Sequence, residues 1–385
     1  MNLCEFVSTM NTNSDLTRIT DYIKEMIPWA HGHQVNALTT FVAAILDQQT
    51  GNQAALARTQ GNQEAACKRL SRLLHNPRLS PRALAEAVCQ QALRHLPKQG
   101  IVRCTIDWTS EGDQHLCVIS LVVGRRAVPI YWRAYAQSVL KGRMKRYELA
   151  VIKRAFHLIT QIVAPGRLRV TADRGFADGD LFALLDALRL RFVIRVKGST
   201  KVCWGGTWHK LKELKFVGHS QHRTLGWVDY CESAPYHAWL TMSRQRNRHG
   251  QWQMWYLLSN YVASATAQAR EYGQRFRCEE GFRDAKWYLG FKQARITCLQ
   301  AWARLFALFA LALLLLTTLG TFVFLQGPRY LARQHLRRVA SRRNGRCELS
   351  LITATLALLQ QDWTWLLCLL PNTKFNLEKT LANVS

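Results

Sequence analysis

Three acidic side chains occupy positions from which they could act together. Asp107 lies at the end of a predicted strand, Asp173 lies just past another, and Glu279 lies in the middle of a predicted long helix. Carboxylates held close together repel one another unless a hard cation neutralises them, and an all-oxygen site suits Mg²⁺ or Mn²⁺. Two such ions about 4 Å apart can activate water or a 3′-hydroxyl and stabilise both oxygens of an in-line phosphoryl displacement. The three carboxylates therefore predict metal-dependent phosphoryl transfer.

The helix around Glu279 carries a second pattern. Tyr272, Arg275, Glu279 and Lys286 stand at offsets of 0, 3, 7 and 14 residues, and at about 100° per residue they fall within a sector of roughly 60° on one helix face. Such a face could ligate a metal through its carboxylate and hold phosphates through its cations. On spacing alone, a helix with salt bridges and a buried Tyr is the favoured explanation of the pattern.

These residues resemble a known signature. The pattern Y-(2)-R-(3)-E-(6)-K, present as YGQRFRCEEGFRDAK, is similar to that of the insertion-sequence-four family of DDE transposases. Asp173 in DRGF and Asp107 in TIDWT match the surroundings of the family's two aspartates, and the 106 residues from Asp173 to Glu279 leave room for a β-rich insertion. The resemblance covers residues 101–325.

The resemblance implies an α/β fold with an RNase H-like catalytic core and a role for each motif residue. Asp107, Asp173 and Glu279 would be catalytic and would ligate two Mg²⁺ or Mn²⁺ ions, while Tyr272, Arg275 and Lys286 would bind DNA. The implied activity is cut-and-paste transposition: cleavage at the transposon ends, often through a DNA hairpin, followed by strand transfer into target DNA. Processing of two ends in one complex would favour a homodimer.

The elements that would position these residues follow from periodicity. Three strands with hairpin-length links are expected over 101–110, 114–124 and 126–135, followed by a helix over 145–163. Residues 167–176 are expected to form a fourth strand that runs into a turn, and a helix over 181–190 and a fifth strand over 191–198 follow. The five strands together would make a mixed sheet. The first and fourth strands can be neighbours in such a sheet, which would bring Asp107 and Asp173 together.

The rest of the chain divides into further regions. Residues 1–98 predict a helical N-terminal DNA-binding region, whose basic stretch at 67–81 is either a DNA contact or a solvated helix face. Within the catalytic domain at 99–326, residues 198–260 predict a β-rich insertion. A long helix is expected from Ser264 to about Tyr288, a second over 297–325, and a basic helical region over 327–385. Four insertion tryptophans could stack on a flipped base but are individually more typical of core packing: Trp204, Trp208, Trp227 and Trp239.

The net charge of the chain indicates what kind of partner it binds. Basic residues outnumber acidic ones by 52 to 25, and +24 of the net +27 lies downstream of residue 100. This bias suits a polyanion, with double-stranded DNA first and an anionic membrane surface second. The composition, with 48% apolar residues, excludes a disordered chain.

Residues 305–325 contain no charged side chain and are long enough to span a bilayer. A helix buried in the core of a large protein has the same composition, and we expect that arrangement and no membrane partner. The eleven cysteines form no C-x-x-C pair, and the N-terminus lacks the pattern of a signal peptide, so a reduced cytoplasmic protein is expected. Two other classes stay open: an RNase H-like endonuclease without strand transfer, and a non-enzymatic basic protein that binds DNA or a membrane.

Overall fold

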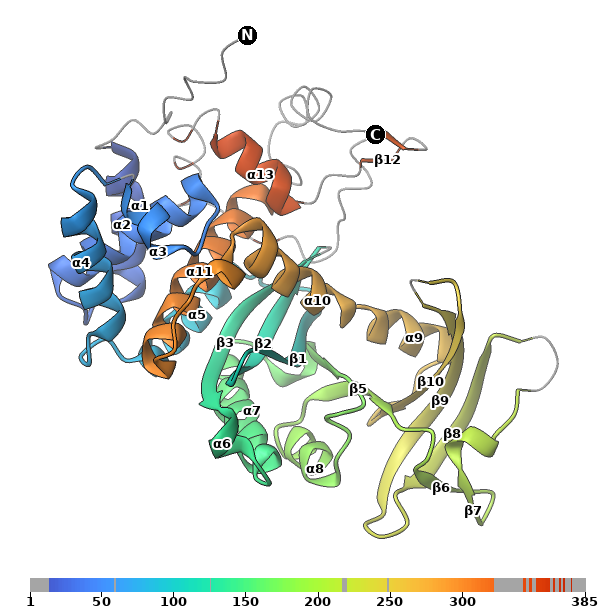
Figure 1. Ribbon diagram of the computed structural model, residues 1–385. Helices are drawn as coiled ribbons and strands as arrows, with labels where there is room; N and C mark the ends of the chain where they lie inside the picture. Colours follow the sequence, from blue (N-terminus) through green and yellow to red (C-terminus); the bar gives the residue numbers. More distant parts are fainter. Residues whose placement is uncertain are drawn as a thin grey trace.

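The computed structural model describes residues 14–58, 60–124, 126–216, 220–247, 249–321, 342–343, 346–347, 351–360, 363, 367, 370 and 375 (Figure 1). The described N-terminal part is helical, as expected. Polar caps start two of its helices, since the Asn62 side chain accepts from the Ala65 amide and the Ser80 side chain from the Ala83 amide. The helices are α1 (Ser14–Met26), α2 (Gly32–Gln48), α3 (Gln53–Arg58), α4 (Gln63–His75) and α5 (Pro81–Arg94).

The five strands expected for the catalytic core are present and adjacent. Their order in the sheet is β3-β2-β1-β4-β5, with β2 antiparallel to both β1 and β3, and β4 parallel to both β1 and β5. The predicted pairing of the first and fourth strands is therefore confirmed. The bounds are β1 (Val102–Glu111), β2 (Gln114–Val123), β3 (Arg126–Ala136), β4 (Leu168–Ala172) and β5 (Arg191–Val196).

Helices connect and cover these strands. The short α6 (Gln137–Leu140) precedes α7 (Met144–Thr160), the 3₁₀ turn η1 (Pro165–Arg167) leads into β4, and α8 (Gly179–Ala187) joins β4 to β5. The last eight residues of β2 are all buried, because helices cover both faces of the sheet there, and this explains their continuous apolar run.

The sheet does not end at the fifth strand, which corrects the expected five-stranded sheet. Tyr256 pairs with Val196, so the insertion continues the core sheet from the edge of β5 to give ten strands in one sheet. Local sequence patterns do not show which strand an edge will pair with, so they give no sign of this continuity. The added strands are β6 (Lys201–Trp204), β7 (Thr207–Lys210), β8 (His222–Tyr230), β9 (Tyr236–Arg246) and β10 (Trp252–Ser259), with the 3₁₀ turn η2 (Leu211–Glu213) after β7.

The long helix expected over 264–288 has the predicted ends but is not one regular helix. Ser264 caps α9 (Ala265–Gly273), a tight turn follows, and α10 (Phe276–Arg283) leads into the π-helical turn η3 (Asp284–Tyr288). The amides of Gln274 and Arg275 bond carbonyls three residues back, whereas the Leu289 amide bonds that of Asp284, five residues back. The helix is thus overwound and then underwound, so a uniform 100° per residue does not describe it.

The second expected helix forms α11 (Leu299–Thr321), preceded by the 3₁₀ turn η4 (Phe291–Gln293). By length and composition α11 could cross a membrane, yet its most apolar window is entirely buried inside the protein. It packs against β3, α2, α5 and α13 (Leu351–Leu359), which is the expected core position. One hydrophobic core therefore runs from the N-terminal helices through α11 to the strands β1–β5.

The expected basic helix of the C-terminal region falls mostly outside the described residues. Within it, Arg342–Arg343 and Arg346–Cys347 pair as the short antiparallel strands β11 and β12. The described part of this arginine-rich run is therefore strand rather than helix, and α13 follows it.

Candidate active site

Asp107 lies inside β1, just beyond the part of the strand that pairs with β4. Its backbone pairs with Val118 of β2, and its side chain is mostly buried. One carboxylate oxygen, Oδ1, accepts the Trp108 amide at 2.9 Å, and the other, Oδ2, accepts from Nη1 of Arg275 at 3.0 Å. Strand β1 fixes the position of this carboxylate in the sheet, and Arg275 from the helical segment packed on the sheet supplies its counter-charge.

Arg275 joins two of the three predicted catalytic carboxylates. While Nη1 holds Asp107, Nη2 donates to Oε1 of Glu279 at 2.6 Å, one turn further along the same segment. Only 7% of Arg275 is exposed, whereas 56% of the Glu279 side chain is. The guanidinium therefore neutralises negative charge between β1 and α10, and it is placed to do so by the tight turn at 274–275.

Asp173 follows directly after β4, where the chain turns. Its Oδ1 accepts the Gly175 amide at 2.7 Å, and its carbonyl accepts the Phe176 amide at 3.1 Å. A side chain on Gly175 would start 3.0 Å from Oδ1, so glycine allows this close approach of backbone to carboxylate. Parallel pairing of Ile106 with Ala172 brings this turn beside Asp107.

The charges of the three carboxylates interact. The pKa of Asp107 is raised to about 6, first by burial and then by the negative charges of Asp173 and Glu279, against the lowering effect of Arg275. A carboxyl group whose pKa is raised in this way lies where the positive charge of the protein does not fully balance the negative charge.

A partly buried polar network ties the two aspartate-bearing segments together. Nε1 of Trp108 donates to Oε2 of Glu148 at 2.9 Å, and Nζ of Lys145 donates both to Oε1 of Glu148 and to the Gly175 carbonyl. Glu148 is 3% exposed, and burial raises its pKa. Helix α7 thereby links the residue after Asp107 to the turn after Asp173. Sequence reasoning missed this network, because only the apolar periodicity of α7 is visible in the sequence.

Tyr272 and Lys286 lie on different parts of the broken helix. The Tyr272 ring is buried and meets Trp255 edge-on, with centroids 4.9 Å apart, while the charges of Arg275, Arg195 and Asp173 all act on its hydroxyl. Lys286, in η3, donates to the Ser110 carbonyl near the end of β1 at 3.1 Å. Tyr272, Arg275 and Glu279 thus surround the aspartates, and Lys286 lies further along β1.

The donor set suits a hard cation in kind, since Asp107, Asp173 and Glu279 offer only carboxylate oxygens and the first is short of positive charge. Among the described residues, however, no three acidic, histidine or cysteine side chains stand close enough together to hold a metal ion. Glu279 does not join such a cluster because its carboxylate is held by Arg275. Asp107 and Asp173 would form the core of a metal site, which Glu279 would complete on leaving the guanidinium.

The insertion tryptophans differ in exposure. The indole nitrogens of Trp204 and Trp239 donate to backbone carbonyls, and both rings are partly buried, as is that of Trp208. Trp227 is 44% exposed and stacks on His237. Trp252, which no sequence pattern singles out, is 49% exposed beneath the guanidinium of Arg246, its partner across the β9–β10 ladder.

Comparison with known families finds a match for part of the chain. Residues 144–315 match the family model described as the transposase DDE domain. The chain contains a transposase DDE domain. DDE domains catalyse phosphoryl transfer on an RNase H-like core, so the protein is an enzyme of that kind, and DNA is its implied partner. No curated protein matches the chain.

The matched span has a clear relation to the site. It begins at the start of α7 and ends within α11, so it includes Asp173, Glu279 and Lys286 and leaves out β1 to β3. Asp107 lies outside the matched span and contacts it through the pairing of β1 with β4 and through its ion pair with Arg275.

Proposed function

We propose that this protein is a DNA transposase of the insertion-sequence-four kind, which cleaves transposon ends and joins them to target DNA. The observation that carries the proposal is the contact of Arg275 with both Asp107 and Glu279, beside the Asp173 turn. This contact brings together residues from a strand, from the end of a second strand and from a helix. A site for in-line phosphoryl displacement needs such an arrangement.

In this proposal Asp107, Asp173 and Glu279 hold two Mg²⁺ or Mn²⁺ ions. When bound, such ions activate the attacking oxygen and stabilise the leaving one. Glu279 is mostly exposed and held by a single guanidinium, so it can turn toward the aspartates without unfolding α10. Arg275, released from its carboxylates, then has a planar fork free for a phosphate.

The same proposal gives positioning roles to the neighbouring residues. Lys286 supplies a point charge near the end of β1, and Tyr272 sets the position of Arg275 by packing beneath the turn at 274–275. A paired-end complex of two chains and a cytoplasmic location are parts of the proposal that rest on the motif resemblance and the cysteine pattern.

Substitution of the carboxylates tests the proposal. Asp107→Ala, Asp173→Ala and Glu279→Gln should each reduce nicking of end-containing DNA by at least about a thousandfold, because a ligand is lost, while affinity for DNA stays within about twofold of wild type. Nicking and electrophoretic shift are measured side by side in Mg²⁺, Mn²⁺ and EDTA. The matched control is Asp180→Asn, because Asp180 is a nearby exposed carboxylate at the start of α8 that lies off the motif.

Two results would contradict the proposal. Nicking that persists in EDTA would exclude metal-dependent chemistry, and full activity of Asp173→Ala would remove the second aspartate from the site. Nicking without joining of the 3′ end to a second duplex would instead assign the chain to the endonuclease class.

A further inference from the structure

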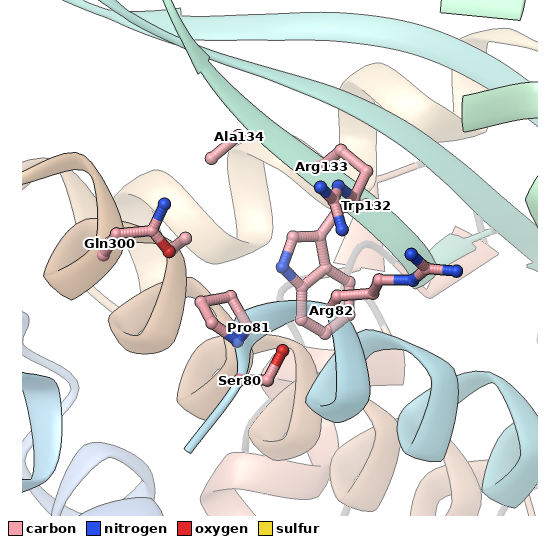
Figure 2. Close-up of a pocket in the computed structure, with 8 residues that line it drawn as sticks. Ser80, Pro81, Arg82, Trp132, Arg133, Ala134 and Gln300 are labelled. Carbon is pink, nitrogen blue, oxygen red and sulfur yellow. The ribbon is translucent and has the colours of Figure 1, made fainter. Parts of the chain in front are cut away.

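A polar cavity lies away from the carboxylates, where the N-terminal helices meet the catalytic sheet (Figure 2). It has a volume of about 280 Å³ and lies between the start of α5, the edge strand β3 and the start of α11. None of the residues around it is acidic, and two are arginines: Ser80, Pro81, Arg82, Trp132, Arg133, Ala134, Gln300 and Ala303.

The cavity contains a buried donor without an acceptor. Trp132 is 1% exposed, and its indole N–H finds no hydrogen-bond partner among the described residues. In Figure 2 this nitrogen lies on the edge of the ring that faces Pro81 and Gln300. An indole nitrogen can only donate, and leaving a buried donor unpaired is costly, so the cavity favours a ligand that brings an acceptor oxygen.

The surrounding charges specify an anion. Pro81 is the first residue of the fourteen-residue helix α5, whose N-terminal end carries partial positive charge, and Ser80 already caps the Ala83 amide. Arg133 and Arg82 also line the cavity, although Arg133 bonds Tyr135 and Arg82 contacts Glu86 one turn along the helix. A donor-only indole, a helix N-terminus and arginines together match the acceptor oxygens of a phosphate group.

The register of the sheet places this cavity relative to the active site. Asp107 pairs with Val118, and Val118 pairs with Trp132, so the side chains of Asp107 and Trp132 project from the same face of the sheet. They are two strands apart, or about 10 Å across the sheet. A phosphate in the cavity would therefore lie within one short stretch of nucleic-acid backbone from the reacting bond.

We propose that this cavity is a phosphate-binding subsite that takes a backbone phosphate of bound DNA. The DNA source rests on the proposed function, whereas the phosphate chemistry does not. The same hydrogen-bond donors would also bind free inorganic phosphate. Binding of DNA and binding of inorganic phosphate are therefore measured separately.

Two substitutions of Gln300, one acidic and one basic, provide the main test. Gln300 is exposed at the second position of α11. An acidic side chain stabilises a helix at this position, because it interacts favourably with the helix dipole. Gln300→Glu should therefore keep the fold and repel a phosphate. In EDTA, its Kd for a duplex of unrelated sequence should rise five- to tenfold, and the slope of log K against log salt should fall by about 1. Gln300→Lys should bind at least as tightly as wild type. Lys153→Gln, on the exposed side of α7, controls for a loss of charge elsewhere.

Removal of the buried donor is the second test. Trp132→Phe deletes the N–H and keeps an aromatic ring against Phe306, and Trp302→Phe is the matched change in α11 away from the cavity. Inorganic phosphate at millimolar concentration should raise the melting temperature of wild type and of Trp302→Phe. The rise should be lost in Trp132→Phe and in Gln300→Glu, and the second variant keeps the test valid if the first does not fold.

Each outcome decides the matter. Weaker DNA binding by Gln300→Glu, with Lys153→Gln unchanged, supports a DNA phosphate in the cavity. A phosphate-dependent melting shift without any change in DNA affinity would overturn the DNA source and leave a free-phosphate site. Normal DNA affinity together with no phosphate shift would overturn the subsite altogether. Because all of these measurements are made without cleavage, they are independent of the nicking assay that tests the proposed function.

Discussion

At the scale of single residues, Arg275 decides the charge balance of the site. Its guanidinium is buried, and it is the counter-charge of Asp107, which lies close enough to Asp173 and Glu279 for their charges to raise its pKa. The motif resemblance implies that Arg275 binds DNA. The structure shows instead what it does in the protein alone, where it offsets the repulsion between carboxylates that bound metal ions would otherwise relieve.

This role predicts a specific pattern of stability. Arg275→Gln leaves Asp107 buried beside other carboxylates, and we expect it to lower the free energy of unfolding by about 3 kcal/mol, mainly through Asp107, since Glu279 is largely solvated. Adding Asp107→Asn in the same chain should recover most of that loss, because the uncompensated charge is removed. A double-mutant cycle with urea unfolding measures the coupling.

The comparison variant for this cycle is Arg283→Gln, which removes an exposed arginine from the same helix, where it contacts Glu280. It should cost less than about 1 kcal/mol and should show no coupling to Asp107→Asn. If Arg275→Gln were as stable as wild type and only its affinity for DNA fell, the guanidinium would serve DNA alone and its contact with Asp107 would carry no energy.

At the scale of elements, the strands were predictable and the shape of the motif helix was not. Alternating residues such as Val102, Cys104 and Ile106 predict β1 because its period of two survives in the fold. The spacing of Tyr272 and Arg275 assumed a regular helix, but the turn between α9 and α10 changes their directions. Tertiary contacts set that turn, and a single sequence contains no signal for them.

One such contact is the approach of α10 to β3. A Cβ added to Gly281 would stand 2.1 Å from the Ala127 carbonyl oxygen, so only glycine lets the helix lie this close to the strand. The ion pairs from Arg126 to Glu280 and Asp284 hold the same two elements together. The glycine is part of the motif segment, yet its role is visible only when β3 is placed beneath it.

The close approach predicts opposite effects for two glycines of the same segment. Gly281→Ala must push α10 away from β3, and we expect a loss of about 2–3 kcal/mol of stability and a nicking rate at least about tenfold lower, since Glu279 moves with the helix. Gly273→Ala meets no atom within 4 Å and should be neutral or up to about 1 kcal/mol stabilising. Thermal unfolding and nicking rates of both variants check this. Equal stability of the two would mean that α10 can shift freely over β3.

At the scale of the whole molecule, packing explains the apolar residues but not the net charge. The N-terminal helices, α11 and the catalytic sheet share one hydrophobic core, so the long apolar helix is explained by packing within the protein. The change of composition near residue 99 predicts separate regions, but composition does not show which buried faces meet. The excess of basic residues, by contrast, is not explained by packing and suits a polyanionic partner.

This excess predicts a steep dependence of DNA affinity on salt, because each neutralised phosphate releases counterions. Two sets of four basic residues can be compared at equal loss of charge. One is the C-terminal set Arg337, Arg338, Arg342 and Arg343, of which the first two lie outside the described residues; the other is the exposed set around α4, Lys68, Arg69, Arg72 and Arg78. Replacing the C-terminal set with Gln should weaken binding to all DNA sequences alike and reduce the slope of log K against log salt by up to about 0.9 for each phosphate that is no longer neutralised.

The α4 set separates direct contact from net charge. If the C-terminal arginines touch DNA, their replacement should flatten the slope more than the same change around α4, although both variants lose four charges. Affinity is measured for one end-containing and one unrelated duplex at four salt concentrations. Equal slopes for the two variants would mean that only the net charge matters, and a slope equal to that of wild type would mean that the C-terminal arginines serve solubility or a protein partner. A larger effect of the α4 set would place the main phosphate contacts on the N-terminal helices, where the basic stretch at 67–81 left that possibility open.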